Sequence, residues 1–476
     1  MRPPQLLLGD VVRSAARRAP RRTAASLAGR ELTFGEAADA SERLAAVLFG
    51  RGVRRGARVV WWGETTLDAI PLYFALAHLG AALVPLNPRF SPDEAGPFIA
   101  RADPALVVTD DHHAGDAILT ELLAQRPPSV VDDQRVEEDD PHVVFFTSGT
   151  TGLPKGVVLS QRTERLRTRG APWPVGPTVC MFPQFHMAGW SIISTWLSGD
   201  EVAFVERADA ELLLQTVHRR RAHTLYAIPA VWRRLLDADR TAYDLSSLRI
   251  ADTGTSATTP ELLAAISDAF PGTTTSISYG STEASLICML WPEDVQRKPG
   301  SVGPPAPASS VRLDDEGELW VSNPYLFSGY FRDEEATTAA LVDGWYRTGE
   351  LAEMDDEGYY SIVGRTKDLI RTGGETVAPV EVDQVVQSHP AVIDAAVAGV
   401  PDKDWGEVIT AFVVVRDGHT LDLPALRRHC EGRLAAHKHP RRLVAVDAIP
   451  RTGATGQVQR RLLVEIASAA AMTPSN

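Results

Sequence analysis

The stretch TSGTTGLPKG, from Thr147 to Gly156, combines three glycines, a run of hydroxyl side chains and one lysine. Apolar runs flank it, Val143–Phe146 before and Val157–Leu159 after, and both are typical of buried strands. Glycine lets backbone N–H groups approach a ligand closely, hydroxyls add short donors, and Lys155 supplies a mobile positive charge. The sequence therefore predicts a phosphate-binding loop held between two strands.

This loop differs from the P-loop of nucleoside triphosphatases, GxxxxGK[ST]. Pro154 stands five residues after Gly149, and Lys155 is followed by Gly156. The apolar run after the lysine also indicates a strand and not the helix whose N-terminus completes a P-loop. For an arbitrary stretch of this composition, a surface turn would be the better interpretation. Motifs further along the chain favour the phosphate site.

Four later stretches are each weak when taken singly, because a Thr-Glu or Gly-Arg pair is usually local structure. They are YGSTEAS (279–285), GWYRTGE (344–350), VGRTKDLIRTGGE (363–375) and PRTGATGQVQRR (450–461). In this order they resemble the motifs of the ANL superfamily of AMP-forming, adenylate-forming enzymes. That superfamily includes acyl- and aryl-CoA synthetases, peptide-synthetase adenylation domains and luciferases. The resemblance extends over nearly the whole chain.

The resemblance implies that the loop from Thr147 to Lys155 binds the β- and γ-phosphates of ATP. Tyr279 would lie against adenine, Thr282 would contact the α-phosphate, and Glu283 would hold Mg²⁺, a hard cation that prefers oxygen ligands. Glu350 and Arg365 would bind the ribose hydroxyls. The implied nucleotide-binding residues are Thr147, Ser148, Gly149, Thr150, Thr151, Gly152, Lys155, Tyr279, Gly280, Thr282, Glu350 and Arg365; the implied catalytic residues are Thr147, Lys155, Thr282, Glu283, Lys367 and Gln457.

The family reaction has two halves, and the resemblance implies both. An acid attacks ATP to give an acyl-adenylate and pyrophosphate, and a thiol, usually that of CoA, then displaces AMP. Between the halves a small domain rotates about a hinge that would fall at Lys367, which brings Gly373 and Gly374 to the thiol tunnel. The implied cofactors are ATP and Mg²⁺, and the acceptor stays open among CoA, a carrier-protein thiol and an amine.

For the acid, the stretch FPQFHMAGW (182–190) resembles the family segment whose histidine gates the acyl pocket, although a lone histidine beside aromatics is more often a core residue. The predicted pocket residues are His186, Ala188, Gly254, Thr255, Ser256 and Ser278. Many relatives have mostly glycine, alanine and proline at the corresponding places. The hydroxyls of Thr255, Ser256 and Ser278 favour a narrower and more polar pocket. We therefore expect a small aromatic or otherwise polar acid.

Two residues depart from the family pattern. Glu350 stands where aspartate is usual, and Gln457 replaces the lysine that contacts the attacking carboxylate, in a loop that looks one residue longer. Loss of one positioned electrostatic donor typically costs about 10²–10³ in rate. Three hypotheses follow: a retuned acid–CoA ligase, an enzyme that activates a non-carboxylate acid such as nitrite for aryl-amine diazotisation, and a nucleotide-binding homologue that has lost catalysis.

The elements around these motifs predict the fold. Helical patterns alternate with short apolar strands over residues 69–205 and 212–284, which indicates α/β layers. Within them, Ala69–Leu86 splits into a buried helix that ends near Gly80 and a short strand from Ala82 to Pro85. We expect a large multi-layer α/β domain over residues 1–364, which binds ATP and the acid, and a small mobile α+β domain over residues 365–476.

The composition limits the function classes. A chain of 476 residues with 44% apolar and 23% charged residues is ordinary for a globular protein. Its net charge of −13 argues against sequence-independent nucleic-acid binding, which needs a basic surface. Three widely spaced cysteines indicate a reduced compartment, and the apolar run at the N-terminus stops too early for a secretory signal. We expect a cytoplasmic protein without a membrane or nucleic-acid partner.

Overall fold

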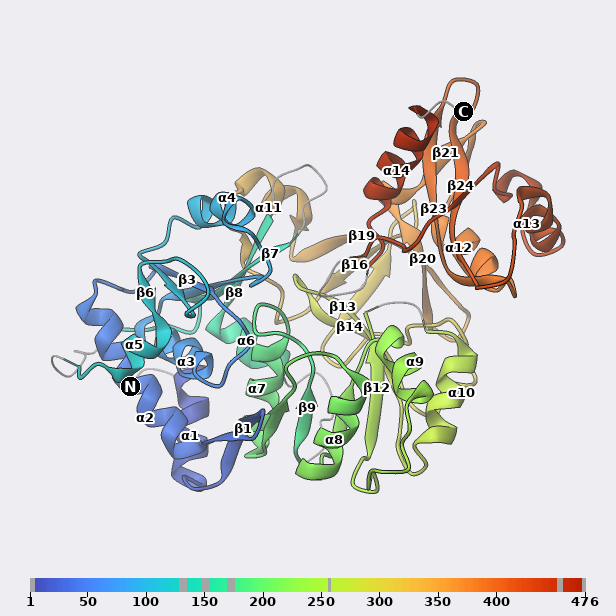
Figure 1. Cartoon of the computed structure of the whole chain (residues 1–476). Coiled ribbons are helices and arrows are strands. Elements are labelled where there is room, and N and C mark those ends of the chain that lie inside the picture. The colour runs from blue at the N-terminus through green and yellow to red at the C-terminus, as the bar shows by residue number, and fades with distance from the viewer. Residues whose placement is uncertain are drawn as a thin grey trace. The chain divides into compact units, whose positions relative to one another are not determined.

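The computed structural model describes residues 5–127, 135–147, 155–168, 176–255, 258–451 and 457–472. The chain divides into two compact units, which Figure 1 traces by colour along the chain. The larger unit comprises Met1–Ser310 and Val321–Tyr346, and the smaller unit comprises Val311–Trp320 and Arg347–Asn476. Each unit is described by itself below.

One sheet of the larger unit has seven strands in the order β17-β8-β7-β4-β3-β5-β6. The pairs among β7, β4, β3, β5 and β6 are parallel, whereas β7 with β8 and β8 with β17 are antiparallel. The strands are β3 (Arg58–Trp62), β4 (Ala82–Leu86), β5 (Leu106–Thr109), β6 (Ala117–Ile118), β7 (Pro141–Thr147), β8 (Lys155–Ser160) and β17 (Gly329–Tyr330). The two strands predicted to flank the phosphate loop are therefore confirmed as β7 and β8.

The second sheet has eight strands in the order β14-β13-β12-β11-β9-β10-β1-β2. All its pairs from β13 to β1 are parallel, and an antiparallel strand lies at each edge. The strands are β1 (Thr23–Leu27), β2 (Arg30–Thr33), β9 (Thr178–Cys180), β10 (Val202–Phe204), β11 (Thr224–Tyr226), β12 (Ile250–Gly254), β13 (Ile277–Ser281) and β14 (Ser285–Leu290). Because parallel strands end at the same edge, the carboxyl ends of β9, β11, β12 and β13 share one edge of this sheet.

The helices of the larger unit join its sheets. One hydrophobic core contains residues of both sheets together with residues of α1, α2, α3 and α7. The helices are α1 (Gly9–Arg18), α2 (Phe34–Gly50), α3 (Ala69–Leu79), α4 (Pro92–Ala102), α5 (Leu119–Ala124), α6 (Gln161–Arg167), α7 (Ala188–Ser198), α8 (Ala210–Arg220), α9 (Pro229–Asp237), α10 (Pro260–Ala269) and α11 (Glu334–Ala340). This arrangement confirms the predicted multi-layer α/β domain.

The long apolar segment forms the helix and strand that the sequence predicts. Helix α3 is buried along nearly its whole length and ends at Gly80, which adopts φ 62°. A residue without a side chain takes up this left-handed conformation at little cost, so the chain turns there into β4. Among the described residues, no helix is long and apolar enough to cross a membrane. The cytoplasmic location stays a prediction.

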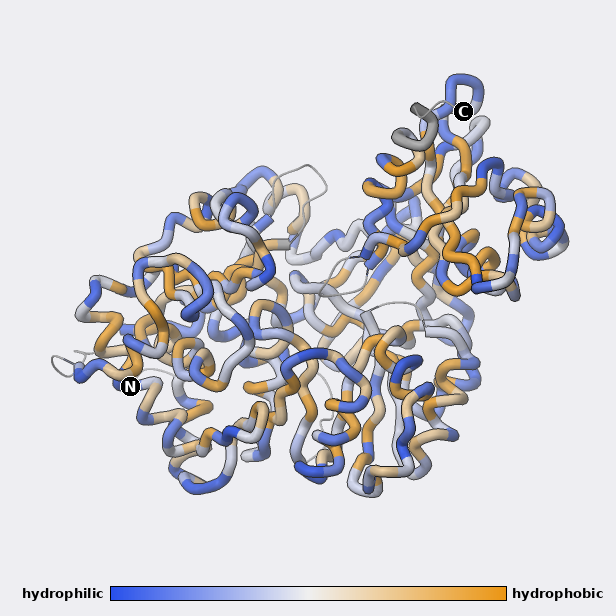
Figure 2. Tube along the Cα trace, in the orientation of Figure 1, coloured by the Kyte–Doolittle hydropathy of each residue, from blue (hydrophilic) through white to orange (hydrophobic). Residues whose placement is uncertain are grey.

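The smaller unit holds a five-stranded sheet in the order β22-β21-β24-β23, with β25 paired to β24. Its strands are β21 (Ile370–Thr372), β22 (Glu375–Val377), β23 (Val392–Asp402), β24 (Gly406–Val415) and β25 (Arg442–Ala445), and its helices are η1 (Thr366–Asp368), α12 (Pro379–Gln387), α13 (Leu423–Cys430), η2 (Ala436–Lys438) and α14 (Arg460–Met472). Figure 2 shows hydrophobic residues along β23 and β24, which carry most of its core. These helices and strands confirm the predicted small α+β domain at the C-terminal end of the sequence.

A further five-stranded sheet lies in the middle of the sequence, in the order β15-β16-β19-β18 with β20 paired to β19. Its strands are β15 (Ser310–Leu313), β16 (Glu318–Ser322), β18 (Leu341–Val342), β19 (Trp345–Met354) and β20 (Tyr360–Arg365). Most of these residues belong to the smaller unit, so that unit begins earlier in the sequence than residue 365. The boundary of the rotating domain at Arg365 stays a prediction.

Candidate active site

The phosphate loop begins and ends on a rigid hairpin. Thr147 at the end of β7 pairs with Lys155 at the start of β8. Ser148, Gly149, Thr150, Thr151 and Gly152, which the sequence places in the loop itself, lie outside the described residues. The base of the loop is anchored in the core, because the neighbouring residues Val143, Val144 and Val157 are buried.

A tyrosine that the sequence did not single out connects two predicted site residues. Tyr330 of β17 lies beside β8, where it pairs with Val157. Its ring lies under the Lys155 ammonium, with 4.9 Å between Nζ and the ring centroid, and its hydroxyl donates to Glu283 Oε1 at 3.1 Å. Burial and the Glu283 carboxylate raise the pKa of Tyr330, which keeps the hydroxyl protonated as a donor. Lys155 and Glu283 therefore lie at one place, with Lys155 over the face of the Tyr330 ring and Glu283 at its hydroxyl.

Glu283 is positioned by the tight hairpin of β13 and β14. Gly280 lies so close to the opposite strand that a Cβ there would stand 1.9 Å from the Ser285 carbonyl oxygen, so this position accepts only glycine. The Ser281 hydroxyl accepts the Ala284 N–H at 3.1 Å, and the Glu283 carbonyl accepts the Phe327 N–H at 2.7 Å. A half-buried carboxylate held in this way beside a lysine fits a hard divalent cation that accompanies phosphates.

The predicted adenine and α-phosphate residues lie on the same hairpin. Tyr279 is on β13, Thr282 is in the turn, and both side chains are half-buried. The hairpin thus presents an aromatic face, a hydroxyl and a carboxylate within five consecutive residues, from Tyr279 to Glu283. These are the group types that orient a nucleotide and its metal ion.

In the smaller unit, the predicted ribose-binding residues form a pair. Glu350 of β19 is directly opposite Arg365 of β20 in the antiparallel register. The Arg365 Nε and Nη2 groups both donate to Glu350 Oε1, at 3.1 and 2.9 Å. The pair is partly exposed, with 17% of the Glu350 and 32% of the Arg365 side chain accessible, so a hydroxylated ligand can reach it.

Lys367 lies in the short helix η1, directly after β20, and is exposed. Its neighbour Asp368 forms an ion pair with Arg460 at 3.6 Å, and Arg460 also binds Asp383 and donates to the Val397 carbonyl. The backbone is therefore anchored just after Lys367, at the start of the packed part of the smaller unit. Such a position is suitable for a hinge.

Gln457 directly follows undescribed residues of the smaller unit, and the paired glycines form its β21–β22 turn. Residues 452–456, the loop that the sequence predicts to be one residue longer, lie outside the described residues. The loop is closed by an isolated antiparallel bridge from Arg451 to Val458, next to Gln457. At the β21–β22 turn, a Cβ on Gly373 would stand 2.6 Å from the Trp405 ring, which is 41% exposed and lies 3.5 Å from the Arg441 guanidinium.

On the acid side, the predicted gate His186 is half-buried just before α7, and Ala188 is the buried first residue of that helix. The His186 ring lies 6.5 Å from the Phe182 ring, and its Nδ1 is buried without a hydrogen-bond partner among the described residues. Burial, and then the nearby Arg167 guanidinium, lower the pKa of His186 to about 4. The ring is therefore neutral at physiological pH.

Gly254 and Ser278, two further predicted pocket residues, pair where β12 ends and β13 begins. A Cβ on Gly254 would stand 2.4 Å from the Ser278 carbonyl oxygen and 2.5 Å from the Tyr226 hydroxyl, so only glycine fits. Thr255 follows with φ 66°, a strained conformation for a β-branched residue and one that clusters at functional sites. Ser256 lies outside the described residues.

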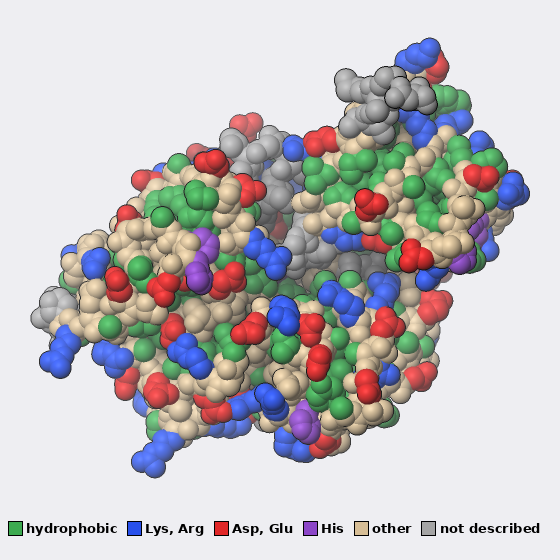
Figure 3. All heavy atoms as spheres, viewed as in Figure 1, with side chains coloured by type: hydrophobic (Ala, Val, Ile, Leu, Met, Phe, Trp, Pro, Cys, Tyr) green, Lys and Arg blue, Asp and Glu red, His purple; other side chains and the backbone are tan. Residues whose placement is uncertain are grey.

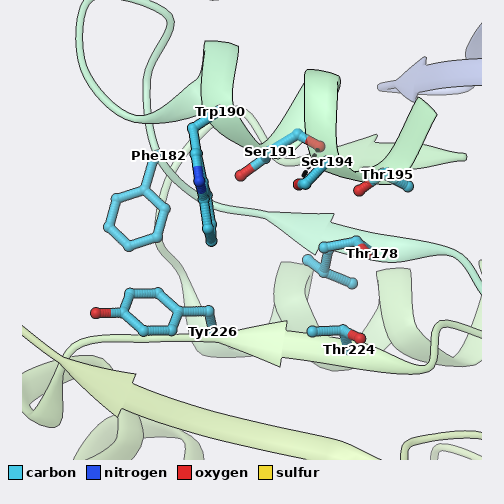
Figure 4. Close-up of a pocket in the computed structure, with 9 residues that line it drawn as sticks. Thr178, Phe182, Trp190, Ser191, Ser194, Thr195, Thr224 and Tyr226 are labelled. Carbon is cyan, nitrogen blue, oxygen red and sulfur yellow. Dashed lines mark hydrogen bonds between the residues drawn. The ribbon is translucent and has the colours of Figure 1, made fainter. Parts of the chain in front are cut away.

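A small cavity lies near Gly254, between helix α7 and the strands β9 and β11. Figure 4 shows three aromatic rings at one end and hydroxyl side chains at the other. Its volume is ≈ 20 Å³, and it is lined by Thr178, Val179, Phe182, Trp190, Ser191, Ser194, Thr195, Thr224 and Tyr226. Of these residues, the sequence analysis placed only Phe182 and Trp190 in a motif. The lining comes from three segments, of which the motif at 182–190 joins two and the third, with Thr224 and Tyr226, comes from elsewhere in the sequence.

Charges of both signs are mixed on the face of the larger unit that Figure 3 shows. The larger unit contains many ion pairs, such as Arg55 with Asp140 and Arg220 with Glu201. A surface of this kind does not attract a polyanion along its length. The residues predicted to bind phosphate and metal, Lys155 and Glu283, instead lie in one local cluster.

Comparison with known proteins finds two family models and many similar proteins. The family described as AMP-binding enzyme matches residues 12–331, and the AMP-binding enzyme C-terminal domain matches residues 381–455. The chain is 32% identical over 462 residues to the 2-succinylbenzoate–CoA ligase of a Listeria monocytogenes strain, covering 94% of this chain and 97% of that protein. It is also 32% identical to the indoleacetate–CoA ligase of Aromatoleum aromaticum over 490 residues, covering 93% and 94%.

A third relative and a solved structure extend the comparison. The feruloyl-CoA synthase of an Amycolatopsis species is 32% identical over 485 residues, covering 94% of this chain and 97% of that protein. The O-succinylbenzoate coenzyme A synthetase of Bacillus subtilis, solved in complex with ATP and a magnesium ion, superposes with a TM-score of 0.85 at 27% identity, covering 95% of this chain and 99% of that one.

Proposed function

Because the chain belongs to the AMP-binding, adenylate-forming enzymes, among the ATP-dependent acid–CoA ligases of that family, we propose that it activates a small aromatic acid as an adenylate and transfers the acyl group to CoA. The observation that carries this proposal is that the face of the Tyr330 ring contacts the Lys155 ammonium while its hydroxyl binds the Glu283 carboxylate. The Lys155 ammonium suits phosphate oxygens, and the Glu283 carboxylate suits the metal ion that accompanies them. The three-residue cluster belongs to a single rigid unit.

The residues of the larger unit would orient ATP for attack. Lys155 would neutralise phosphate charge, the Tyr279 ring would lie against adenine, and Thr282 would donate to the α-phosphate. Glu283 would hold Mg²⁺, which in this class of site neutralises charge on the phosphates. Tyr330 keeps the Glu283 carboxylate in place through its hydrogen bond. Positioning and charge neutralisation account for most of the catalysis in such transfers.

In the smaller unit, Glu350 would accept from ribose hydroxyls while Arg365 holds its carboxylate. The additional methylene of glutamate, compared with the usual aspartate, places that carboxylate further from its backbone. We propose that Lys367 is the hinge of the rotation between half-reactions, because the chain is exposed there and anchored directly afterwards at Asp368. The Gly373–Gly374 turn would then serve the thiol half-reaction.

The class of acid is proposed from the pocket and from the relatives. The three named relatives act on succinylbenzoate, indoleacetate and ferulate, all of them aromatic acids. In this chain, the Phe182 and Tyr226 rings pack 5.5 Å apart, next to His186 and Gly254. Flat apolar walls of this kind suit an aromatic ring. Because His186 is neutral, it can lie against an apolar acid without burying a charge.

Gln457 is proposed to occupy the position of the usual C-terminal lysine. A neutral amide there can donate a hydrogen bond to the attacking carboxylate but supplies no positive charge. We expect adenylation to be slow compared with that of a lysine-containing relative, since a charged donor stabilises developing negative charge better than a neutral one.

Pyrophosphate release with a panel of acids tests the proposal. The panel holds benzoate, succinylbenzoate, indoleacetate, ferulate, a long-chain fatty acid, and nitrite with an aryl amine, each with ATP, Mg²⁺ and CoA. We expect release of pyrophosphate and formation of a thioester with at least one aromatic acid. Release only with nitrite would favour the diazotisation hypothesis instead, and release with none of the panel, in a protein that still binds ATP, would favour a homologue that has lost catalysis.

A further inference from the structure

The hydroxyl end of the cavity contains a group that lacks a partner. Thr224 is 1% exposed, and its hydroxyl has no hydrogen-bond partner among the described residues. Leaving a buried hydroxyl unsatisfied is costly, so a site of this kind usually receives a water molecule or a ligand group. Thr195 and Ser194 lie across the cavity on α7, where the Ser194 hydroxyl donates to the Ser191 carbonyl at 3.1 Å (Figure 4). The hydroxyl end therefore offers hydrogen bonds to an additional polar group.

The cavity is too small for an acid. A volume of ≈ 20 Å³ accommodates about one water molecule and no aromatic ring. Its aromatic end is closed by Phe182, Trp190 and Tyr226, whose rings stand together in Figure 4. The cavity is thus a small compartment behind an aromatic wall.

Tyr226 extends from this cavity to the predicted acid pocket. Its ring lines the cavity, and Figure 4 shows its hydroxyl pointing away from the hydroxyl end. That hydroxyl is in close contact with Gly254, which pairs with Ser278. Burial, and then the nearby Asp252 carboxylate, raise the pKa of Tyr226, so it remains a neutral phenol. One side chain therefore separates the two spaces.

We propose that Tyr226 determines which acids the enzyme accepts, by closing the acid pocket at Gly254 and Ser278, and that the cavity behind it is a second compartment suited to the polar end of a longer acid. The inference rests on the proposed function, because it takes Gly254 and Ser278 to border the acid. It predicts that the natural protein accepts compact aromatic acids and discriminates against acids extended opposite the carboxylate.

The test compares three acids and three proteins. The acids are benzoate, para-propylbenzoate and para-hydroxyethylbenzoate; the last two have nearly the same length and differ by a terminal methyl or hydroxyl group. The proteins are the natural chain, Tyr226→Ala, which opens the wall, and Tyr226→Phe, which keeps the ring and removes only the hydroxyl. The measured quantity is kcat/KM for pyrophosphate release, with the thermal unfolding midpoint as the control for folding.

We expect the ratio of kcat/KM for para-hydroxyethylbenzoate to that for benzoate to rise about tenfold or more in Tyr226→Ala, and to stay near the natural value in Tyr226→Phe. A hydrogen bond to a buried group is worth about 1 kcal/mol or more, so the hydroxyethyl acid should exceed the propyl acid several-fold in Tyr226→Ala. Adding Thr224→Val to that variant should remove this preference, because the unpaired hydroxyl is then gone.

An unchanged ratio in a folded Tyr226→Ala protein would overturn the proposal. An equal rise in Tyr226→Phe would also overturn it, because the hydroxyl contact at Gly254, and not the ring, would then decide the length of acid accepted. If Tyr226→Ala does not fold, Tyr226→Leu shortens the wall and retains apolar contact.

If the natural protein releases no pyrophosphate with any acid, the proposed function fails. Tyr226 is then tested by calorimetric binding of para-hydroxyethylbenzoate, which should be tighter in Tyr226→Ala and is contradicted by equal affinity.

Discussion

The nucleotide side of the larger unit and the cavity beside α7 are positioned in different ways. On the nucleotide side, five consecutive residues from Tyr279 to Glu283 include the residues predicted for adenine, the α-phosphate and the metal ion, and one tight hairpin holds them. The cavity lining comes from three segments that span residues 178–226 and that meet only because β9 and β11 are neighbouring parallel strands with α7 beside them. Local chain geometry fixes the first region, and tertiary packing fixes the second.

This difference affects how each region tolerates change. The nucleotide hairpin requires glycine at position 280, and the phosphate loop requires a rigid base, so substitutions there should affect catalysis directly. The cavity is bounded by side chains whose sizes can vary while the backbone stays in place. Nucleotide chemistry should therefore be sensitive to single groups, whereas acid specificity should be adjustable.

Glu283→Gln should have the largest effect. The substitution keeps the side-chain volume and an oxygen that can accept from Tyr330, but it removes the negative charge proposed to bind Mg²⁺. We expect Mg²⁺-dependent pyrophosphate release to fall by about 10³-fold with an unchanged unfolding midpoint. The matched control is Tyr330→Phe, which retains the carboxylate and removes one hydrogen bond and should cost much less. Normal activity of Glu283→Gln would show that catalysis does not need this carboxylate. The nucleotide side would then not be the region that is sensitive to single groups.

Lys367→Pro should separate the two half-reactions. Proline fixes φ and removes the backbone N–H at the proposed hinge. We expect the half-reaction that needs the rotated domain to fall by about 10²-fold, because small misplacements of reacting groups have effects of that size. Lys367→Ala is the control, since it leaves the backbone free. The measurement is the single-turnover rate of adenylate formation and of thioester formation. Equal losses in the two half-reactions, in a protein that stays folded, would argue against a hinge at this residue.

Gln457→Lys is the substitution expected to increase activity. If residue 457 occupies the position of the family lysine and the acid is a carboxylate, a positive charge there should raise adenylate formation by up to about 10²-fold. The thioester half-reaction should change little. Gln457→Met, which is similar in length but uncharged, is the control. A neutral or harmful effect in pre-steady-state adenylate formation would indicate that the loop before residue 457 places it elsewhere, or that the acid is not a carboxylate.

The difference between local chain geometry and tertiary packing also explains which features the sequence could predict. The strands at the phosphate loop, the helix ending at Gly80 and the α/β layers follow from local apolar patterns and turn residues, so all three predictions are confirmed. Gly254 and Ser278 are neighbours on paired strands, and their role in the acid pocket stays a prediction. Tyr330 could not be found from local signals, because it reaches Glu283 across 47 residues of sequence. Tyr226 and Thr224 were missed for the same reason: their importance comes from the packing of α7 over β11.

The smallest effect concerns the strand that supports the phosphate loop. His142 of β7 is fully buried, lies 4.4 Å from the Tyr73 ring, and has no hydrogen-bond partner for either ring nitrogen among the described residues. Burial lowers the pKa of His142 from its ordinary value of 6.5 to about 3. Below pH 6.5 the unfolded chain therefore binds a proton that the folded chain does not, so this residue makes the folded state less stable as the pH falls.

His142→Phe should remove that dependence. We expect the free energy of unfolding of the variant, minus that of the natural protein, to increase by about 1.4 kcal/mol for each pH unit below the ordinary pKa of histidine, until the folded-state pKa is reached. The measurement is denaturant unfolding of the larger unit at several pH values between neutrality and mild acid. His142→Leu is the control: it should give the same slope with a different offset, which separates the proton effect from packing against Tyr73. If the difference in the free energy of unfolding does not change with pH, the His142 ring takes up protons in the folded protein as readily as in the unfolded chain. Strand β7 would then not be the rigid base that distinguishes the nucleotide side from the adjustable cavity.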